Sequence, residues 1–309
     1  MSKISQYIKF SNEVKNALQN NLPIVALEST IISHGMPYPN NYQTAIRLEK
    51  IVRDNKAVPA TIAIINGYIH IGLEEHEIEY LSKPENKSEI KKVSRKDLPA
   101  ILGLKFSGAT TVAATMMIAN LVGIRVFATG GIGGVHREAQ ITMDISADLL
   151  ELSNTNVTVV CSGVKSILDI GLTLEYLETH GVPIYGYQTE KFPAFYLRDS
   201  GFKVDYVIEN ALDFKKIIEA KTALKLKGGQ IVANPVPFEF EINPEKINNA
   251  INIALNESKM ANITGKQVTP FLLSKISNIT SGDSLLTNIE LVCNNAYVAS
   301  LLAVELKKN

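Results

Sequence analysis

The chain has 309 residues, of which 46% are hydrophobic and 20% charged, enough apolar material for one large α/β domain or two small ones. Lys+Arg and Asp+Glu number 31 each, so the net charge is zero and gives no basic excess that would favour a nucleic acid or an anionic membrane as partner. Its two cysteines, Cys161 and Cys293, form no disulfide framework, and the first ten residues lack an apolar signal core. We therefore expect a soluble, cytoplasmic protein.

Short strands and helices alternate along the chain. The hydrophobic pattern predicts strands over 24–27, 59–65, 68–72, 125–128, 157–161, 183–187 and 230–233. It predicts helices over 12–20, 42–54, 75–81, 110–122, 145–153, 166–179, 214–226, 244–260 and 284–306, with another starting at 269–270. Alternation without repeats indicates a mainly parallel sheet covered by helices on both faces, and no linker divides residues 1–309, which favours a single domain.

Residues 107–124 carry no charge and are long enough to be a candidate membrane span. However, this segment contains several threonines as well as Asn120 and Gly123, and it runs directly into a strand. A buried helix is therefore the better interpretation.

Lys165 follows the strand predicted over 157–161 and would open the helix predicted over 166–179. Ligands of open α/β sheets bind at the carboxyl ends of the strands, where this lysine would lie. The partial positive charge of a helix N-terminus would favour the neutral amine, which is a nucleophile for a sugar or carbonyl carbon. The alternative is an ordinary surface lysine in a first helical turn.

Glu28 ends the predicted strand 24–27. A carboxylate at the end of an apolar strand can have a raised pKa and serve as a general acid. The alternative is a carboxylate that accepts hydrogen bonds from backbone amides of the following turn.

Residues 128–137 contain four glycines followed by His136 and Arg137. Glycines allow backbone amides to approach an anion closely, and the two side chains add donors. The segment could be mistaken for a dinucleotide-binding fingerprint, but it lacks the third glycine of that pattern. The alternative is a purely structural turn.

Two further segments suggest ligands. Asp144 and Asp148 are four residues apart, so on a helix both carboxylates could face one side and bind a divalent ion that keeps several waters; a capped helix start is the alternative. Lys92 begins a cationic cluster that could hold a phosphate or could be a solvated loop.

Together these segments resemble the pseudouridine-5'-phosphate glycosidases, also called the indigoidine synthase A-like family. The stretches that carry the resemblance are 25–38, 58–74, 92–99, 108–116, 127–137, 144–149, 159–169, 234–237 and 282–289. Lys96 stands where the family pattern has an arginine, which affects only a peripheral charge.

The resemblance implies reversible cleavage of the C–C glycosidic bond of pseudouridine 5'-phosphate to uracil and ribose 5-phosphate. It implies a three-layer α/β/α sandwich, one Mn²⁺ per subunit and a homotrimer. It also implies that Lys165 is the covalent nucleophile, Glu28 the general acid and Asp144 the metal ligand. The substrate-binding residues expected from the family or from the glycine-rich segment are Lys92, Val112, Thr129, His136, Arg137, Ser146, Ala147 and Asp148.

This chemistry suits the residues, because a carbon leaving group has no lone pair that a general acid could protonate. Opening the sugar ring first would expose an electrophilic C1', to which Lys165 could add to give an imine intermediate. Two other functions remain alternatives: a non-catalytic sugar-phosphate sensor and a dinucleotide-dependent oxidoreductase.

Overall fold

The computed structural model describes residues 3–308. Its strands form one sheet in the order β1-β4-β3-β2-β7-β8-β11-β9-β10, with β6 pairing both β3 and β5. All pairings are parallel except those that β3 makes with β4 and with β6. The strands are β1 (Ile8–Phe10), β2 (Ile24–Leu27), β3 (Val58–Ile65), β4 (Tyr68–Ile71), β5 (Lys91–Val93), β6 (Gly108–Thr110), β7 (Val126–Ala128), β8 (Thr158–Cys161), β9 (Ile184–Tyr187), β10 (Tyr206–Ile208) and β11 (Gln230–Ala233).

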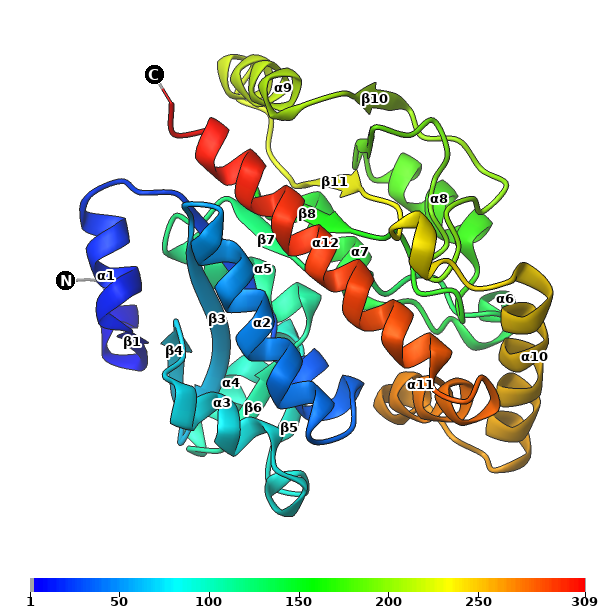
Figure 1. Cartoon of the computed structure of the whole chain (residues 1–309). Coiled ribbons are helices and arrows are strands. Elements are labelled where there is room, and N and C mark those ends of the chain that lie inside the picture. Colours follow the sequence, from blue (N-terminus) through cyan, green and yellow to red (C-terminus); the bar gives the residue numbers. More distant parts are fainter. Residues whose placement is uncertain (1–2, 309) are drawn as a thin grey trace.

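Helices cover both faces of this sheet (Figure 1). They are α1 (Asn12–Gln19), α2 (Asn40–Asp54), α3 (Glu75–Ser82), α4 (Leu98–Gly103), α5 (Val112–Leu121), α6 (Ala139–Thr142), α7 (Ala147–Asn154), α8 (Ile170–Thr179), α9 (Ala211–Ala223), α10 (Pro244–Met260), α11 (Val268–Ile279) and α12 (Asp283–Glu305). Helices α2 and α12 cross the face that is in front in Figure 1, and α5 and α7 lie behind the strands. The expected α/β/α sandwich with a mainly parallel sheet is confirmed.

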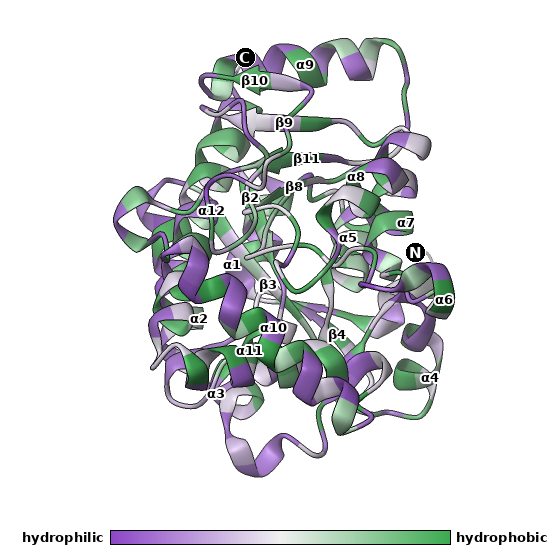
Figure 2. Ribbon diagram, turned by 90° about the vertical axis from the view of Figure 1, so that its right-hand side faces the viewer, coloured by the Kyte–Doolittle hydropathy of each residue, from purple (hydrophilic) through white to green (hydrophobic). Residues whose placement is uncertain are grey.

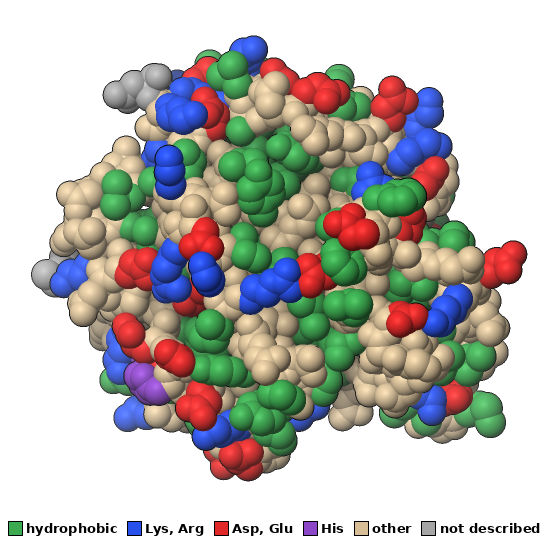
Figure 3. Space-filling view, in the orientation of Figure 1, with side chains coloured by type: hydrophobic (Ala, Val, Ile, Leu, Met, Phe, Trp, Pro, Cys, Tyr) green, Lys and Arg blue, Asp and Glu red, His purple; other side chains and the backbone are tan. Residues whose placement is uncertain are grey.

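The central strands are buried on both sides, which explains their continuous apolar runs. Val25, Phe127, Val159 and Ile231, one from each of four neighbouring strands, have no exposed surface. In Figure 2, α9 and α10 alternate between hydrophobic and hydrophilic residues around their turns, as helices with one buried face do. Figure 3 shows Lys, Arg, Asp and Glu intermixed on the face formed by α2 and α12, in line with the zero net charge.

The predicted hairpin at Asn66-Gly67 is confirmed. Strands β3 and β4 pair in antiparallel register on either side of it. Both turn residues have positive φ, 50° and 78°, as a two-residue hairpin loop requires. A Cβ at Gly67 would come within 2.7 Å of Lys105 Cα, so glycine is needed there for space as well as for conformation.

The apolar run 107–124 is mostly buried, as expected, but it is divided into two elements. Gly108–Thr110 forms β6, and the Thr111 side chain then accepts a hydrogen bond from Ala114 N to cap α5. Within the described part of the chain, no helix is both long and apolar enough to cross a membrane. Hydrophobicity alone did not reveal this boundary, because strand and helix are equally apolar here.

The prediction that a helix starts at residue 166 was wrong. Helix α8 begins at Ile170 and is capped by Asp169, whose side chain accepts a hydrogen bond from Leu172 N at 2.9 Å. Residues 162–169 are irregular, and Val164 forms a bridge with Ile132 of the glycine-rich segment. Lys165 therefore lies in a loop between β8 and α8, and the helix-dipole argument does not apply to it.

Candidate active site

A cavity of about 700 Å³ opens at the carboxyl ends of β2, β6, β7 and β8. The first residues beyond these strands line it: Glu28 after β2, Thr111 after β6, Thr129 after β7 and, a few residues beyond β8, Lys165. Strands β2, β7 and β8 are parallel and end at one edge of the sheet, so Glu28 and Lys165 meet here although they are more than 130 positions apart in sequence. Strand β6, which is antiparallel to β3, brings Thr111 to the same cavity.

Glu28 is a buried acid of this cavity. Its side chain accepts a hydrogen bond from the Thr129 hydroxyl, rather than from an amide of the following turn. Burial raises the pKa of Glu28, and the nearby Lys165 ammonium opposes part of that rise. The carboxyl group is thus disposed to retain a proton, as a general acid must.

Backbone contacts with the glycine-rich segment fix the position of Lys165. Its amide donates to Ile132 O at 3.1 Å, and its carbonyl accepts from Leu168 N at 2.9 Å. The side chain lines the cavity together with Glu28. The structure therefore brings the two predicted catalytic residues into one site.

Lys92 enters the same cavity from β5, and its side chain is half-buried. Burial, and next the Lys165 ammonium, lower the pKa of Lys92 to about 8, while Asp148 and Glu28 oppose the shift. Lys92 is thus part of a charged cluster with Glu28 and Lys165, and the alternative of a solvated loop is wrong.

Asp148 connects two segments of the site. Its Oδ1 accepts from Ala113 N and its Oδ2 from Gly133 N, both at 2.9 Å, so the carboxylate holds the glycine-rich segment against the start of α5. A Cβ on Gly133 would lie 2.2 Å from Ser146 Oγ, which explains why glycine is required at this position. Asp148 is thereby assigned a positioning role in the geometry of the site.

The expectation that Asp144 and Asp148 share one helical turn was wrong. Helix α7 begins at Ala147 with Ser146 as its cap, so Asp144 lies outside the helix. Asp144 Oδ2 is instead 3.8 Å from His136 Nδ1, and both residues line the cavity. Burial lowers the pKa of His136, and the Asp144 carboxylate opposes this shift.

Most backbone amides of the glycine-rich segment already have partners. Ile132 N donates to Gly163 O at 3.0 Å, Val135 N to Thr173 Oγ1 at 2.9 Å and His136 N to Asp144 O at 3.0 Å. These contacts fix part of the segment in place, and its binding of an anion stays a prediction. It offers no free cradle for a dinucleotide pyrophosphate at these positions.

Comparison with known proteins agrees with this architecture. The sequence model described as "Indigoidine synthase A like protein" matches residues 13–305. This chain belongs to the indigoidine synthase A-like family. It is similar to proteins named pseudouridine-5'-phosphate glycosidase, with 59% identity to one from Clostridium botulinum (99% of each chain) and 54% to one from Escherichia coli K12 (99% of this chain and 98% of that protein).

Two solved structures of similar proteins share the fold over nearly the whole chain. The prealnumycin C-glycosynthase AlnA, in complex with ribulose 5-phosphate, has a TM-score of 0.88 and 37% identity, over 98% of this chain and 97% of that one. An indigoidine synthase A-like protein from Thermotoga maritima has a TM-score of 0.88 and 35% identity, over 97% of each chain. The chain therefore has the same fold as these two solved structures.

The structure separates one predicted binding residue from the others. Val112, Ser146 and Ala147 line the cavity as expected for this family. Arg137 instead lines a neighbouring cavity of about 730 Å³, where its guanidinium donates to Ser166 O at 3.5 Å. The segment changes direction after His136, and spacing along the sequence gives no sign of this.

Sequence reasoning assigned no role to two polar residues of this family's cavity. His34 Nε2 and Asn288 Oδ1 are buried and lack hydrogen-bond partners within residues 3–308. Burial, with the charge of Lys92, lowers the pKa of His34 to about 4. Both residues lie inside stretches that resemble the family, at 25–38 and 282–289, which is the signal that could have identified them.

Proposed function

We propose that this protein reversibly cleaves the C–C glycosidic bond of pseudouridine 5'-phosphate to give uracil and ribose 5-phosphate. The names of the relatives and the sugar phosphate in the AlnA complex support the substrate class. The observation that carries the proposal is the meeting of buried Glu28 with Lys165 in one cavity.

The reaction needs ring opening before bond cleavage, because uracil leaves through carbon. Glu28 donates a proton to the sugar ring oxygen, the C1'–oxygen bond breaks, and C1' becomes electrophilic in conjugation with the uracil ring. Lys165, as the neutral amine, adds to C1'. After protonation of uracil C5, the C1'–C5 bond breaks and the lysine nitrogen forms an imine, which water hydrolyses to ribose 5-phosphate.

Other residues of the cavity position this pair and hold the substrate. Thr129 holds the Glu28 carboxyl by its hydrogen bond. Lys92, still partly protonated at neutral pH, contacts an anionic part of the substrate. His136, Val112 and Ser146 to Asp148 line the space around the substrate.

Asp144 fits a divalent ion that retains most of its water. Its carboxylate is half-exposed at the cavity, and its Oδ2 lies 3.8 Å from His136 Nδ1. No set of three or more His, Cys, Asp or Glu residues that could hold a metal occurs within 3–308, so the protein would supply few ligands. A hard ion such as Mn²⁺, one per subunit, suits this oxygen donor and would supply charge that stabilises substrate oxygens.

Release of uracil from pseudouridine 5'-phosphate in the presence of Mn²⁺ tests the proposal, with the Lys165→Ala protein beside the wild type. We expect uracil from the wild type and none from the variant. Borohydride added during turnover should attach the sugar phosphate covalently to the wild type alone. A Lys191→Ala protein, altered at an exposed lysine that does not line the cavity, serves as control.

Two other outcomes have distinct signatures. A sugar-phosphate sensor would bind pseudouridine 5'-phosphate without releasing uracil, and an oxidoreductase would bind a nicotinamide dinucleotide. Turnover by Lys165→Ala at the wild-type rate would refute the covalent route.

Homotrimeric assembly, a single domain over 1–309 and a cytoplasmic location remain predictions. Sedimentation equilibrium tests the homotrimer.

A further inference from the structure

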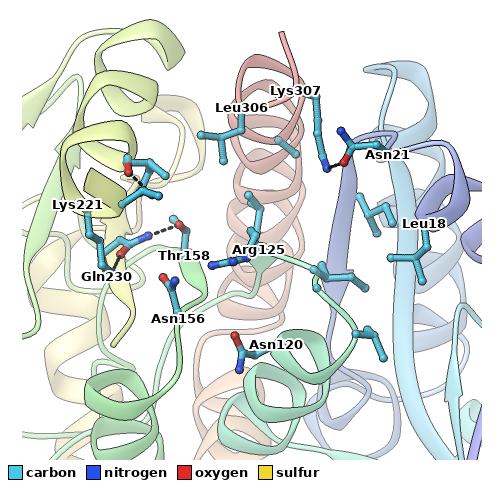
Figure 4. Close-up of a pocket in the computed structure, with 18 of the residues that line it drawn as sticks. Leu18, Asn21, Asn120, Arg125, Asn156, Thr158, Lys221, Gln230, Leu306 and Lys307 are labelled. Atoms are coloured by element: carbon cyan, nitrogen blue, oxygen red, sulfur yellow. Dashed lines mark hydrogen bonds between the residues drawn. The ribbon is translucent and has the colours of Figure 1, made fainter. Parts of the chain in front are cut away.

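A second cavity, of about 860 Å³, lies at the opposite edge of the sheet from the candidate active site. Ile24, Val126, Thr158 and Gln230 line it, and each is the first residue of a central strand. Helices α1, α9 and the end of α12 surround it (Figure 4). Nothing in the proposed reaction uses this amino-end cavity.

The amino-end cavity is strongly cationic. The basic residues that line it are Arg125, Lys221, Lys225, Lys227, Lys307 and Lys308. No Asp or Glu is among its described lining residues. This asymmetry is local, because the whole chain has equal numbers of basic and acidic residues.

Five of these six cations lack a carboxylate partner within residues 3–308, and only Lys308 forms an ion pair, with Glu305. Lys221 Nζ instead donates to Gly228 O at 2.6 Å and to the Gln230 side chain. Lys307 donates to the Asn21 side chain. Neutral acceptors orient these ammonium groups without neutralising them.

The cations are also close enough to affect one another. Figure 4 shows Arg125 between Lys221 and Lys307. Burial, and next the Arg125 charge, lower the pKa of Lys221 to about 8 and also lower the pKa of Lys307. Like charges gathered in a partly desolvated space are unfavourable, and a bound anion would remove that cost.

The remaining walls indicate an organic anion rather than a bare inorganic one. Leu18, Leu22, Leu226 and Leu306 contribute apolar surface. Amide side chains that can bind the polar edge of a heterocycle come from Asn120, Asn154 and Asn156. The volume lies within the range of small-molecule sites.

We propose that the amino-end cavity binds a nucleoside phosphate, with its phosphate among Arg125, Lys221 and Lys307 and its base between the leucines and amides. Strands β7 and β8 connect this site directly to Thr129 and to the segment that carries Lys165. The ligand would therefore occupy the end of the sheet opposite the catalytic residues.

Calorimetric titration with ADP, without added metal and at physiological ionic strength, tests the proposal. The test variant Arg125→Gln/Lys307→Gln removes two exposed cations that form no ion pairs. The matched control Lys203→Gln/Lys105→Gln removes the same charge from exposed positions outside the cavity. We expect the test variant to weaken ADP binding about tenfold and the control to change it less than twofold.

Separate titrations with adenosine and with inorganic phosphate test the two parts of the nucleotide. Each compound should bind more weakly than ADP. Phosphate that binds as tightly as ADP would reduce the site to an inorganic anion site and overturn the proposal. The absence of ADP binding to folded wild type, an unchanged affinity in the test variant, or an equal loss in the control would overturn it as well. If the first test variant does not fold, a second test variant, Lys225→Gln/Lys227→Gln, removes two other cations of the same cavity and should also weaken ADP binding.

Discussion

The Thr129 hydroxyl donates a hydrogen bond to the Glu28 carboxylate, and strand register makes this contact possible. Leu27 of β2 pairs with Ala128 of β7. The next residue of each strand is therefore Glu28 and Thr129, side by side at the same sheet edge. The candidate general acid and the residue that holds it depend on one parallel pairing between strands about a hundred residues apart.

Replacing Thr129 by Val should slow uracil release 10- to 100-fold, because the Glu28 carboxyl loses the contact that orients it. That hydrogen bond lowers the pKa of Glu28, so its loss should raise the pKa further. The alkaline limb of the pH dependence of kcat/KM, where the acid loses its proton, should move to higher pH. Thr129→Ser retains the hydroxyl and should behave like the wild type; a Ser variant as slow as the Val variant would contradict this role.

Replacing Glu28 by Gln should abolish at least 99% of the activity and yet stabilise the fold at alkaline pH. Burial raises the pKa of Glu28 above its ordinary value of 4.5, so the folded state holds the proton more tightly than the unfolded state. The wild type therefore loses stability as pH rises through the folded-state pKa.

Urea unfolding at several pH values measures this effect. Glu28→Gln should be more stable than the wild type at pH 8, and the difference should shrink as the pH falls toward 4.5. A variant that is less stable than the wild type at pH 8 would contradict the assignment of a buried carboxyl group with a raised pKa.

Lys92 should titrate near pH 8 because of burial and the charge of Lys165. In a Lys165→Met protein, one of these two causes is gone, so the pKa of Lys92 should rise toward its ordinary value of 10.5. NMR of ¹³C-methylated lysines follows this titration directly. A Lys92 signal that titrates alike in both proteins would show that the two ammonium groups do not interact.

Replacing Asp148 by Ala should destabilise the protein by about 3 kcal/mol, because the buried amides of Ala113 and Gly133 lose their acceptor. Thermal or urea unfolding measures the loss, and Asp148→Asn, which keeps one acceptor oxygen, should lose less. Asp144→Ala is the matched control at a half-exposed carboxylate, and it should change stability by less than about 0.5 kcal/mol.

Replacing Asp144 by Asn should remove the stimulation of uracil release by Mn²⁺ and leave the fold intact, since this carboxylate is the proposed metal ligand. Activity of the EDTA-treated protein, measured as Mn²⁺ is added back, gives the comparison. Glu138→Gln, a surface acid paired with Lys259 at 2.6 Å, is the control. Equal stimulation of Asp144→Asn and wild type would place the ion elsewhere.

Local patterns in the sequence were sufficient for the features that depend on neighbouring residues. The apolar runs of β2, β8 and β11, the Asn66-Gly67 hairpin and the polar residues at strand ends follow from side-chain period and turn conformation. Once the sheet is parallel, the strand ends must share one edge, which agrees with the single site for Glu28 and Lys165 that the family resemblance implied.

Tertiary structure alone decided how the remaining groups are used, because long-range contacts determine which amides and charges are satisfied. Asp148 is engaged by backbone amides from two distant segments, Arg137 turns into a neighbouring cavity, and Asp169 delays the start of α8. The cationic amino-end cavity collects basic residues from positions 125 to 308. No local pattern could reveal it, because packing brings those charges together without any periodic signal in the chain.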